Sequence, residues 1–340
     1  MTRRRLLPAI LLAGILASVL LLAGCKSTEK GVSTWSANGG DPSFEKQEEV
    51  SADKLMQFGV YPQSKADSKI QSDIKSKVTI DEETGLWNEC DDETMYARYD
   101  LETGYFIYAA KVDGVRQEEQ YYMQCGEDLF LVEPLQWIVL ETVGSDSIII
   151  SNKVIDGGRK YSDLYGECTW ETSSMRDWLN GTGDYDARTG SAYNTQLNFI
   201  NRAFTDQEIS RIQTVSLTAA DNEIYGTDGG AGTTDKIYLL SAAEFEKYFK
   251  AEDSEINAMA YATDYAVARG VSAGRDSEAN WWLRDPGAKT YMLGVNRAGT
   301  VTEGGYSVHD TTEGIRPVLR VPTSLLQSCL LYTSDAADEL

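Results

Sequence analysis

The chain has 340 residues, of which 42% are hydrophobic, and its 53 acidic against 31 basic side chains give a formal net charge of −22 at pH 7. So acidic a body repels nucleic acid and anionic lipid, which argues against both as ligands. The apolar content is sufficient for a core, and the single histidine, His309, excludes zinc sites built from several histidines.

The first residues have the pattern of a targeting segment. Arg3, Arg4 and Arg5 precede an apolar run over residues 6–22, and Leu22-Ala23-Gly24-Cys25 follows. This ending resembles the lipobox of bacterial lipoproteins, whose cysteine is lipidated and becomes the new N-terminus. We therefore expect a signal peptide over residues 1–24, a lipid on Cys25, and an extracytoplasmic protein anchored to the bacterial membrane or cell surface. An uncleaved transmembrane anchor is the alternative.

Both ends differ in composition from the body between them. Residues 25–54 are rich in Ser, Gly, Lys and Glu, which predicts a flexible tether. Residues 328–340 resemble a translated sequencing adapter, with a natural acidic tail as the alternative. One folded domain is expected over residues 55–327.

The folded part is expected to begin with a strand over residues 56–63, stopped by a turn at Pro62. Residues 64–132 predict a β-rich subregion with long loops and strands near residues 105–108 and 121–123. No cofactor is predicted. The acidic runs 81–83 and 91–93 favour solvated loops, with bound Ca²⁺ as the alternative because carboxylate oxygens suit that ion.

Three cysteines remain inside the expected domain: Cys90, Cys125 and Cys168. They allow at most one internal disulfide. We predict a Cys90–Cys125 pair, because both lie in the polar N-terminal half, and a buried, apolar role for Cys168.

The middle of the chain predicts a hairpin and then several short helices. Residues 135–140 and 148–150 read as its two strands. A helix capped by Thr172 or Ser173 is expected to end at Asn180-Gly181, before an exposed loop over residues 181–198.

Two capping boxes mark later helices, one at Thr205 with Glu208 and the other at Ser241 with Glu244. A strand is expected over residues 236–240 and a further helix over residues 255–269, stopped at Gly270. Helices segregated from mostly antiparallel strands predict an α+β fold.

Residues 281–321 read as short strands separated by glycines, with chemically varied side chains on the loops. Alternation along a strand predicts that one of Trp281 and Trp282 points inward and the other outward, and the core is favoured for at least one. Arg284 and Arg316 have apolar neighbours and are expected to tie loops to carboxylates or carbonyls. A packed frame carrying varied loops is typical of a binding surface.

Seven motifs occur in an order that resembles the bacterial DUF6273 family over roughly residues 58–321: EPLQWIVL (133–140), TWET (169–172), RDWLN (176–180), AF (203–204), YGTDGG (225–230), WWLRDPG (281–287) and GIRPVL (314–319). Relative to that family, residues 181–198 look like an insertion. The C-terminal motifs are in turn similar to the C-type-lectin-like fold, in the branch of formylglycine-generating enzymes and of the variable proteins of diversity-generating retroelements.

In those variable proteins a constant frame carries loop positions that change. The resemblance implies a frame made of Trp281, Trp282, Arg284, Gly314, Arg316 and Pro317. The matching ligand-binding positions are Asp285, Lys289, Tyr291, Asn296, Arg297, Tyr306, His309 and Asp310. Formylglycine-generating chemistry is not expected, because it uses a late cysteine pair and no cysteine lies between Cys168 and Cys329.

The sequence therefore predicts a surface-anchored lipoprotein, not an enzyme, that binds a protein or glycan ligand through C-terminal loop residues, a retroelement-diversified receptor being one form of it. Catalysis through His309 has no paired nucleophile in its favour. An extracellular glycan-active hydrolase using paired carboxylates is one alternative. A structural envelope lipoprotein is the other.

Overall fold

The computed structural model describes residues 55–251, 254 and 256–325. The expected signal peptide, the lipid site Cys25, the tether and the adapter-like tail all lie outside these residues. Within the described part, no helix combines the length and apolar character needed to cross a membrane.

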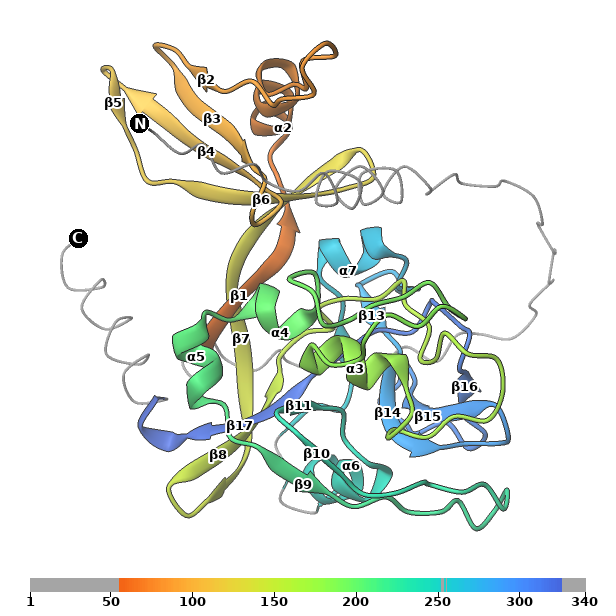
Figure 1. Cartoon of the computed structure of the whole chain (residues 1–340). Coiled ribbons are helices and arrows are strands. Elements are labelled where there is room, and N and C mark those ends of the chain that lie inside the picture. The colour runs from red at the N-terminus through yellow and green to blue at the C-terminus, as the bar shows by residue number, and fades with distance from the viewer. Residues whose placement is uncertain (1–54, 252–253, 255, 326–340) are drawn as a thin grey trace, which may run out of the picture.

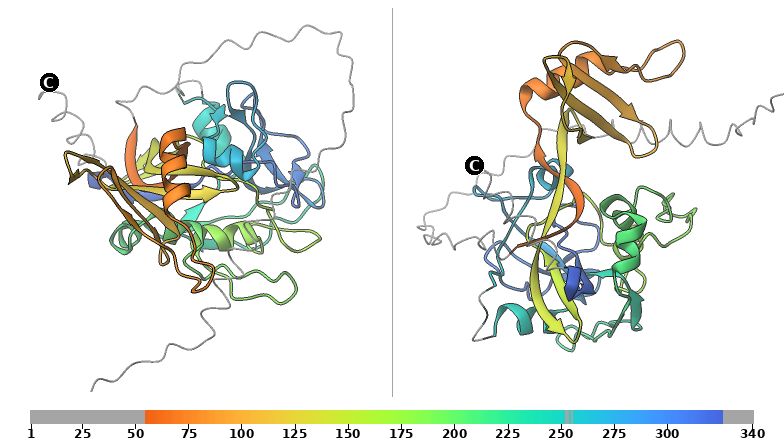
Figure 2. Two further views of the ribbon diagram at one scale, coloured as in Figure 1. Left: turned by 90° about the horizontal axis from the view of Figure 1, so that it is seen from above. Right: turned by 90° about the vertical axis from the view of Figure 1, so that its left-hand side faces the viewer.

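A small N-terminal lobe projects from a larger body, and two long strands run through both (Figures 1 and 2). These strands are β1 (Met56–Lys65) and β7 (Asp128–Val143), and they pair antiparallel. The other elements of the lobe are α2 (Ser68–Lys77), β2 (Cys90–Asp91), β3 (Met95–Asp100), β4 (Tyr105–Val112), β5 (Val115–Arg116) and β6 (Gln120–Cys125).

Strand β1 does not stop at Pro62, so that prediction is wrong. It continues to Lys65, and Pro62 lies opposite Val132 of β7. Because β1 pairs with β7 alone, it is an edge strand, the place in a sheet where proline is tolerated. At the bulge in β1, Gly59 has φ 71°, and a Cβ there would lie 2.5 Å from the ring of Phe204.

The N-terminal lobe contains a helix that the sequence analysis missed. The Asp67 side chain caps α2 by accepting a hydrogen bond from the Lys69 N–H. Ile74 is fully buried and Val78 nearly so, in a small core with Phe106 and other side chains of the lobe. Few apolar residues mark the buried face of α2, so its helical period is faint in a polar segment.

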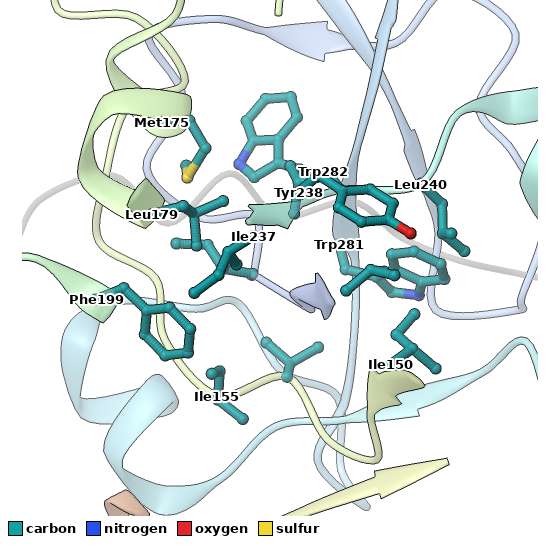
Figure 3. Close-up of a cluster of buried hydrophobic side chains, with 14 of the residues drawn as sticks. Ile150, Ile155, Met175, Leu179, Phe199, Ile237, Tyr238, Leu240, Trp281 and Trp282 are labelled. Atoms are coloured by element: carbon teal, nitrogen blue, oxygen red, sulfur yellow. The ribbon is translucent and has the colours of Figure 1, made fainter. Parts of the chain in front are cut away.

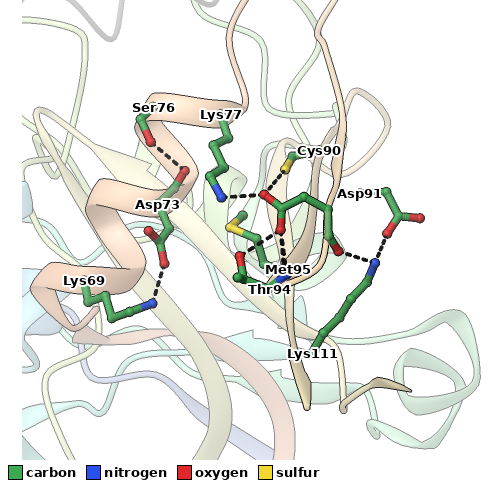
Figure 4. A network of polar contacts seen from close by, with 10 residues as sticks. Lys69, Asp73, Ser76, Lys77, Cys90, Asp91, Thr94, Met95 and Lys111 are labelled. Carbon is green, nitrogen blue, oxygen red and sulfur yellow. Dashed lines mark hydrogen bonds and ion pairs between the residues drawn. The ribbon is translucent and has the colours of Figure 1, made fainter. Parts of the chain in front are cut away.

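Ion pairs occupy the acidic run at residues 91–92 (Figure 4). Asp91 pairs with Lys111, and Asp92 lies 2.6 Å from Nζ of Lys77. Hydrogen bonds from Lys77 and Thr94 hold the pKa of Asp92 well below its usual range. In the described chain, no three His, Cys, Asp or Glu side chains group as metal ligands would.

The predicted Cys90–Cys125 disulfide is wrong, because both residues are thiols. Cys90 lies on β2 and Cys125 ends β6, with β3 and β4 between these strands. Three strand spacings amount to roughly 14 Å, well beyond the reach of a disulfide. Cys168 is buried, and burial raises the pKa of its thiol to about 11.

The main sheet runs from the body into the lobe in the order β11-β17-β8-β7-β6-β4-β3-β2. The predicted hairpin is confirmed as β7 and β8, in which Ile138 faces Ile150. The body strands of this sheet are β8 (Asp146–Ser151), β11 (Ile237–Tyr238) and β17 (Val318–Pro322). Smaller sheets contain β9 (Val215–Leu217), β10 (Thr233–Asp235), β12 (Ala260–Tyr261), β13 (Glu278–Ala279), β14 (Trp281–Pro286), β15 (Tyr291–Val295) and β16 (Tyr306–Ser307). Their pairings are antiparallel, so the α+β prediction is confirmed.

Short helices cover the body, and most of their predicted ends are confirmed. They are α3 (Ser174–Asn180), α4 (Phe199–Ala203), α5 (Asp206–Arg211), α6 (Ala242–Phe249) and α7 (Asp264–Arg269). Ser173 caps α3, and the capping boxes of α5 and α6 form as predicted. The long helix expected over residues 255–269 is wrong in its first half, where β12 pairs with β13; Thr263 caps α7 instead.

The core of the body forms where α3 and α4 pack against the sheet (Figure 3). Met175, Leu179 and Phe199 come from these helices, whereas Ile150 and Ile237 come from strands. Trp281 and Trp282 lie in the same core. The C-terminal segment is thus anchored at its start by its two largest side chains.

Candidate functional site

Trp281 and Trp282 are both fully buried, so the prediction that one of them points outward is wrong. Their side chains do point to opposite faces of β14, but other side chains cover both faces. The ring of Trp281 packs 5.9 Å from Phe245 of α6, and the ring of Trp282 packs 5.2 Å from Tyr161. Strand β14 is therefore a rigid support for the loops that follow it.

Arg284 and Arg316 are nearly inaccessible to solvent and bind within the protein. Arg284 donates to Leu239 O at 2.9 Å and pairs with the carboxylate of Glu244. Arg316 Nε donates to Ser151 O at 2.8 Å, and its guanidinium lies over the Trp281 ring. These contacts leave neither guanidinium on the surface.

Asp285 lies at the edge of a small hollow rather than on an open loop. Its carboxylate accepts a hydrogen bond from the Ala242 N–H at 2.8 Å, and burial raises its pKa. The hollow has room for about one water molecule, far less than a small-molecule site. It is lined by Arg284, Asp285, Pro286, Trp170, Thr233 and residues 217–220, 229 and 231.

Lys289 lies in the turn between β14 and β15, and Tyr291 begins β15, the central strand of the three-stranded sheet β14-β15-β16, so both lie at one end of this sheet. Both side chains face solvent, and Tyr291 is 42% exposed. Tyr291 is paired with Ser307, and the Val308 N–H donates to Thr290 O at 3.0 Å. The register thus brings Tyr291 beside the segment that carries His309 and Asp310.

The ring of Tyr165 stacks on that of His309, with ring centroids 4.9 Å apart and an angle of 8° between the planes. Tyr165 is 90% exposed, more than any other large hydrophobic or aromatic side chain in the described chain. The Ser162 N–H donates to Val308 O at 3.1 Å and holds the two segments together. The sequence analysis missed Tyr165, because a lone aromatic residue in a loop has no periodic signal.

The side chains of Asn296, Arg297 and Tyr306 are engaged within the protein. Asn296 accepts from the N–H groups of its own turn, and Arg297 donates to Ser272 Oγ at 2.5 Å. Tyr306 is half-buried, with its ring at 88° to that of Trp282, and burial raises its pKa to about 12. Four of the predicted binding positions lie on two segments that meet at the start of β15: Lys289, Tyr291, His309 and Asp310.

Glu313 is a second residue that the sequence analysis missed. It is only 4% exposed, and burial followed by the charge of Asp310 raises the pKa of its carboxyl to about 7. Thr312 Oγ1 donates to Glu313 at 3.2 Å and to Asp310 at 2.8 Å. The carboxyl groups of Asp310 and Glu313 therefore lie close together around the Thr312 hydroxyl, in the segment that follows His309.

A family model described as "Domain of unknown function (DUF6273)" matches residues 145–323, just over half of the chain. No curated protein and no solved structure matches. The match contains every residue of the C-terminal frame and the stacked pair, and it begins in the turn between β7 and β8.

Proposed function

Because the chain belongs to the DUF6273 family, whose description leaves its activity open, we propose a function from the chain's own surface: it is a surface-anchored lipoprotein that binds a protein or glycan ligand through its C-terminal loops. The Leu22-Ala23-Gly24-Cys25 motif supports anchoring through a lipid on Cys25. An anchor of this kind would hold the folded domain outside the cytoplasm.

The observation that carries the proposal is the stacked pair of Tyr165 and His309. Stacking on His309 favours one orientation of the Tyr165 ring while leaving the ring exposed and available to a ligand. Rigid aromatic rings offer a large contact area at a low cost in conformational entropy. The neighbouring segments at the start of β15 add a cation, a further ring and a carboxylate, from Lys289, Tyr291 and Asp310.

A C-type-lectin-like arrangement of the C-terminal segment is part of the same proposal. The buried frame of Trp281, Trp282, Arg284 and Arg316 supports it, because that frame can stay constant while the loops vary. If the protein is a diversified receptor, substitutions should accumulate at exposed codons such as 289 and 291. Many independent sequencing reads of the locus and its flanking genes test this. Varied codons beside a reverse transcriptase gene would support a diversified receptor, whereas identical reads would mean that the receptor has one sequence.

A binding experiment tests the proposal directly. The intact chain is immobilised and screened against neutral glycans and against proteins of the cell surface. Tyr165→Ala and His309→Ala are expected to weaken binding with no change in thermal stability. Tyr121→Ala, a change at a 40%-exposed tyrosine of the N-terminal lobe, is the matched control and should bind normally. Unchanged binding by Tyr165→Ala would refute the proposed face.

The pair of Asp310 and Glu313 favours a second candidate, a glycan-active hydrolase. A carboxyl with a pKa of about 7 can donate a proton near neutral pH, and a pair of carboxyl groups is what glycoside hydrolysis uses. Glu313 would be the acid and Asp310 the base or nucleophile. Glycan turnover that falls at least about 100-fold in both Glu313→Gln and Asp310→Asn would support it. Glu303→Gln, at an exposed position, is the control.

A further inference from the structure

We infer that residues 181–198, the loop between α3 and α4, form a second arm of the binding face, and that the ligand is an extended chain of neutral sugars. This inference rests on the proposed function and specifies its ligand. Four observations support it: the anchoring of the loop, the exposure of Tyr185, the small size of the hollow beside Asp285 and the charge of the chain.

The loop is tied to the segment that carries Tyr165. The carboxylate of Asp163 accepts a hydrogen bond from Ser191 Oγ at 2.9 Å and another from the Tyr193 hydroxyl. Asp163 is two residues before Tyr165 and one residue after Ser162, whose N–H donates to Val308 O. One short segment therefore joins the loop to the stacked pair.

The loop carries a second exposed tyrosine, Tyr185, which is 68% exposed. The residues on both sides of it are braced. Asn194 Nδ2 donates to the Asp184 carboxylate at 2.7 Å, and Asp186 forms an antiparallel bridge with Ser191. Because Ser191 also binds Asp163, the backbone of Tyr185 is held close to the Tyr165 segment.

Two separate exposed rings fit a chain better than a compact molecule. Each tyrosine can stack on the apolar face of one sugar ring, and the carboxylates and hydroxyls around them can bind its hydroxyl groups. The hollow beside Asp285 is too small to take a sugar ring and its neighbours. Contact with both tyrosines means that affinity grows with the length of the ligand until it reaches both rings.

The charge of the protein selects among sugar polymers. A net charge of −22 repels anionic polysaccharides such as polymers of uronic acids or sugar phosphates. The loop adds Asp184 and Asp186 to the face, and only Arg188 offsets them locally by pairing with Asp186. A neutral glycan meets no such repulsion.

The experiment is a titration of the intact chain with neutral oligosaccharides of glucose, N-acetylglucosamine, mannose and galactose, from monosaccharides to long chains. For one of these series, affinity should rise with length and then level off. Tyr185→Ala should lower the affinity for long chains about five-fold and leave that for the shortest ligands unchanged. Tyr165→Ala should lower both, and Tyr121→Ala neither.

A second variant separates positioning from contact. Tyr193→Phe removes the hydrogen bond to Asp163 but keeps the ring, so it should weaken long-chain binding while the melting temperature stays near that of the parent. Length-independent affinity, or full long-chain affinity in Tyr185→Ala, would overturn the inference and leave the proposed function standing. Binding to proteins alone, if Tyr165→Ala still weakens it, would also overturn the inference and leave the proposed function standing. Binding of any ligand that is insensitive to Tyr165→Ala would instead remove the proposed function.

Discussion

Glu244 and Arg284 join helix α6 to strand β14 through a two-point contact, in which both Nη atoms of Arg284 donate to the carboxylate of Glu244. The same carboxylate accepts the Ser241 N–H at 2.9 Å and closes the capping box of α6. One side chain therefore caps a helix and neutralises a buried cation beneath the candidate binding face.

Replacing Glu244 with alanine should destabilise the protein by about 3–5 kcal/mol, because it leaves the buried Arg284 guanidinium with the Leu239 carbonyl but without its carboxylate partner. The lost cap contributes to the same effect. Urea unfolding measures the change. Glu246→Ala, at an exposed site of the same helix, should stay within about 0.5 kcal/mol of the parent. Equal losses of unfolding free energy in Glu244→Ala and Glu246→Ala would mean that the Glu244–Arg284 pair adds no stability of its own.

The raised pKa of Glu313 makes stability depend on pH in a defined direction. The folded state keeps this proton up to about pH 7, whereas the unfolded chain releases it near the usual value of 4.5. Between these values the unfolded state binds fewer protons, so stability falls as pH rises. Through this group alone, the free energy of unfolding above pH 7 should be about 3 kcal/mol lower than below pH 4.5, at about 1.4 kcal/mol for each pKa unit.

Glu313→Gln provides the comparison for this pH effect, because glutamine cannot titrate. Urea midpoints measured from about pH 5 to about pH 8 should decline less steeply in this variant than in the parent. The difference between the two curves removes the contributions of the other titrating groups. Parallel curves would show that Glu313 is ionised in the folded protein throughout this range.

Tyr61→Phe should cost about 1–3 kcal/mol. The Tyr61 hydroxyl donates to the buried carboxylate of Asp156 at 2.6 Å, and its loss leaves Asp156 with only the Gly157 N–H and Arg269 as donors. Thermal unfolding compares this variant with Tyr185→Phe, at a tyrosine on an exposed loop. An equal melting temperature for both would contradict the importance of this bond.

The thiols should differ in reactivity. Cys90 is partly exposed on β2, whereas Cys125 and Cys168 are buried. Brief treatment of the native protein with iodoacetamide, followed by peptide mass mapping, should label Cys90 first among these three. Cys125 and Cys168 should be labelled rapidly only in urea. Early labelling of Cys168 would mean that its loop opens in the native state.

Local signals in the sequence predicted much of the body of the fold. The caps at Ser173, Thr205 and Ser241 could be read because each helix start depends on residues three positions apart. The helix expected over residues 255–269 failed because the apolar spacing of its first half is satisfied by β12 in a sheet with β13, a partner distant in sequence. Periodicity alone does not distinguish these outcomes.

The candidate site was harder to predict than the fold, because it depends on which segments meet. The sequence pointed to Tyr291 and His309 but not to Tyr165, which is far from His309 in the chain and reaches it through a loop. The side chain of Tyr306 looked equivalent to that of Tyr291. Register separates them, since Tyr306 turns toward Trp282 while Tyr291 faces solvent.

The position of β7 has a practical consequence for work on isolated fragments. A fragment cut at residue 145, where the family match begins, would keep β8 but lose the whole of its partner β7, including the buried Trp137. The open edge of β8 carries Ile148, Ile149 and Ile150, which makes it a template for intermolecular pairing. Such a fragment should aggregate on expression, whereas one that starts at residue 55 retains both long strands and should remain soluble.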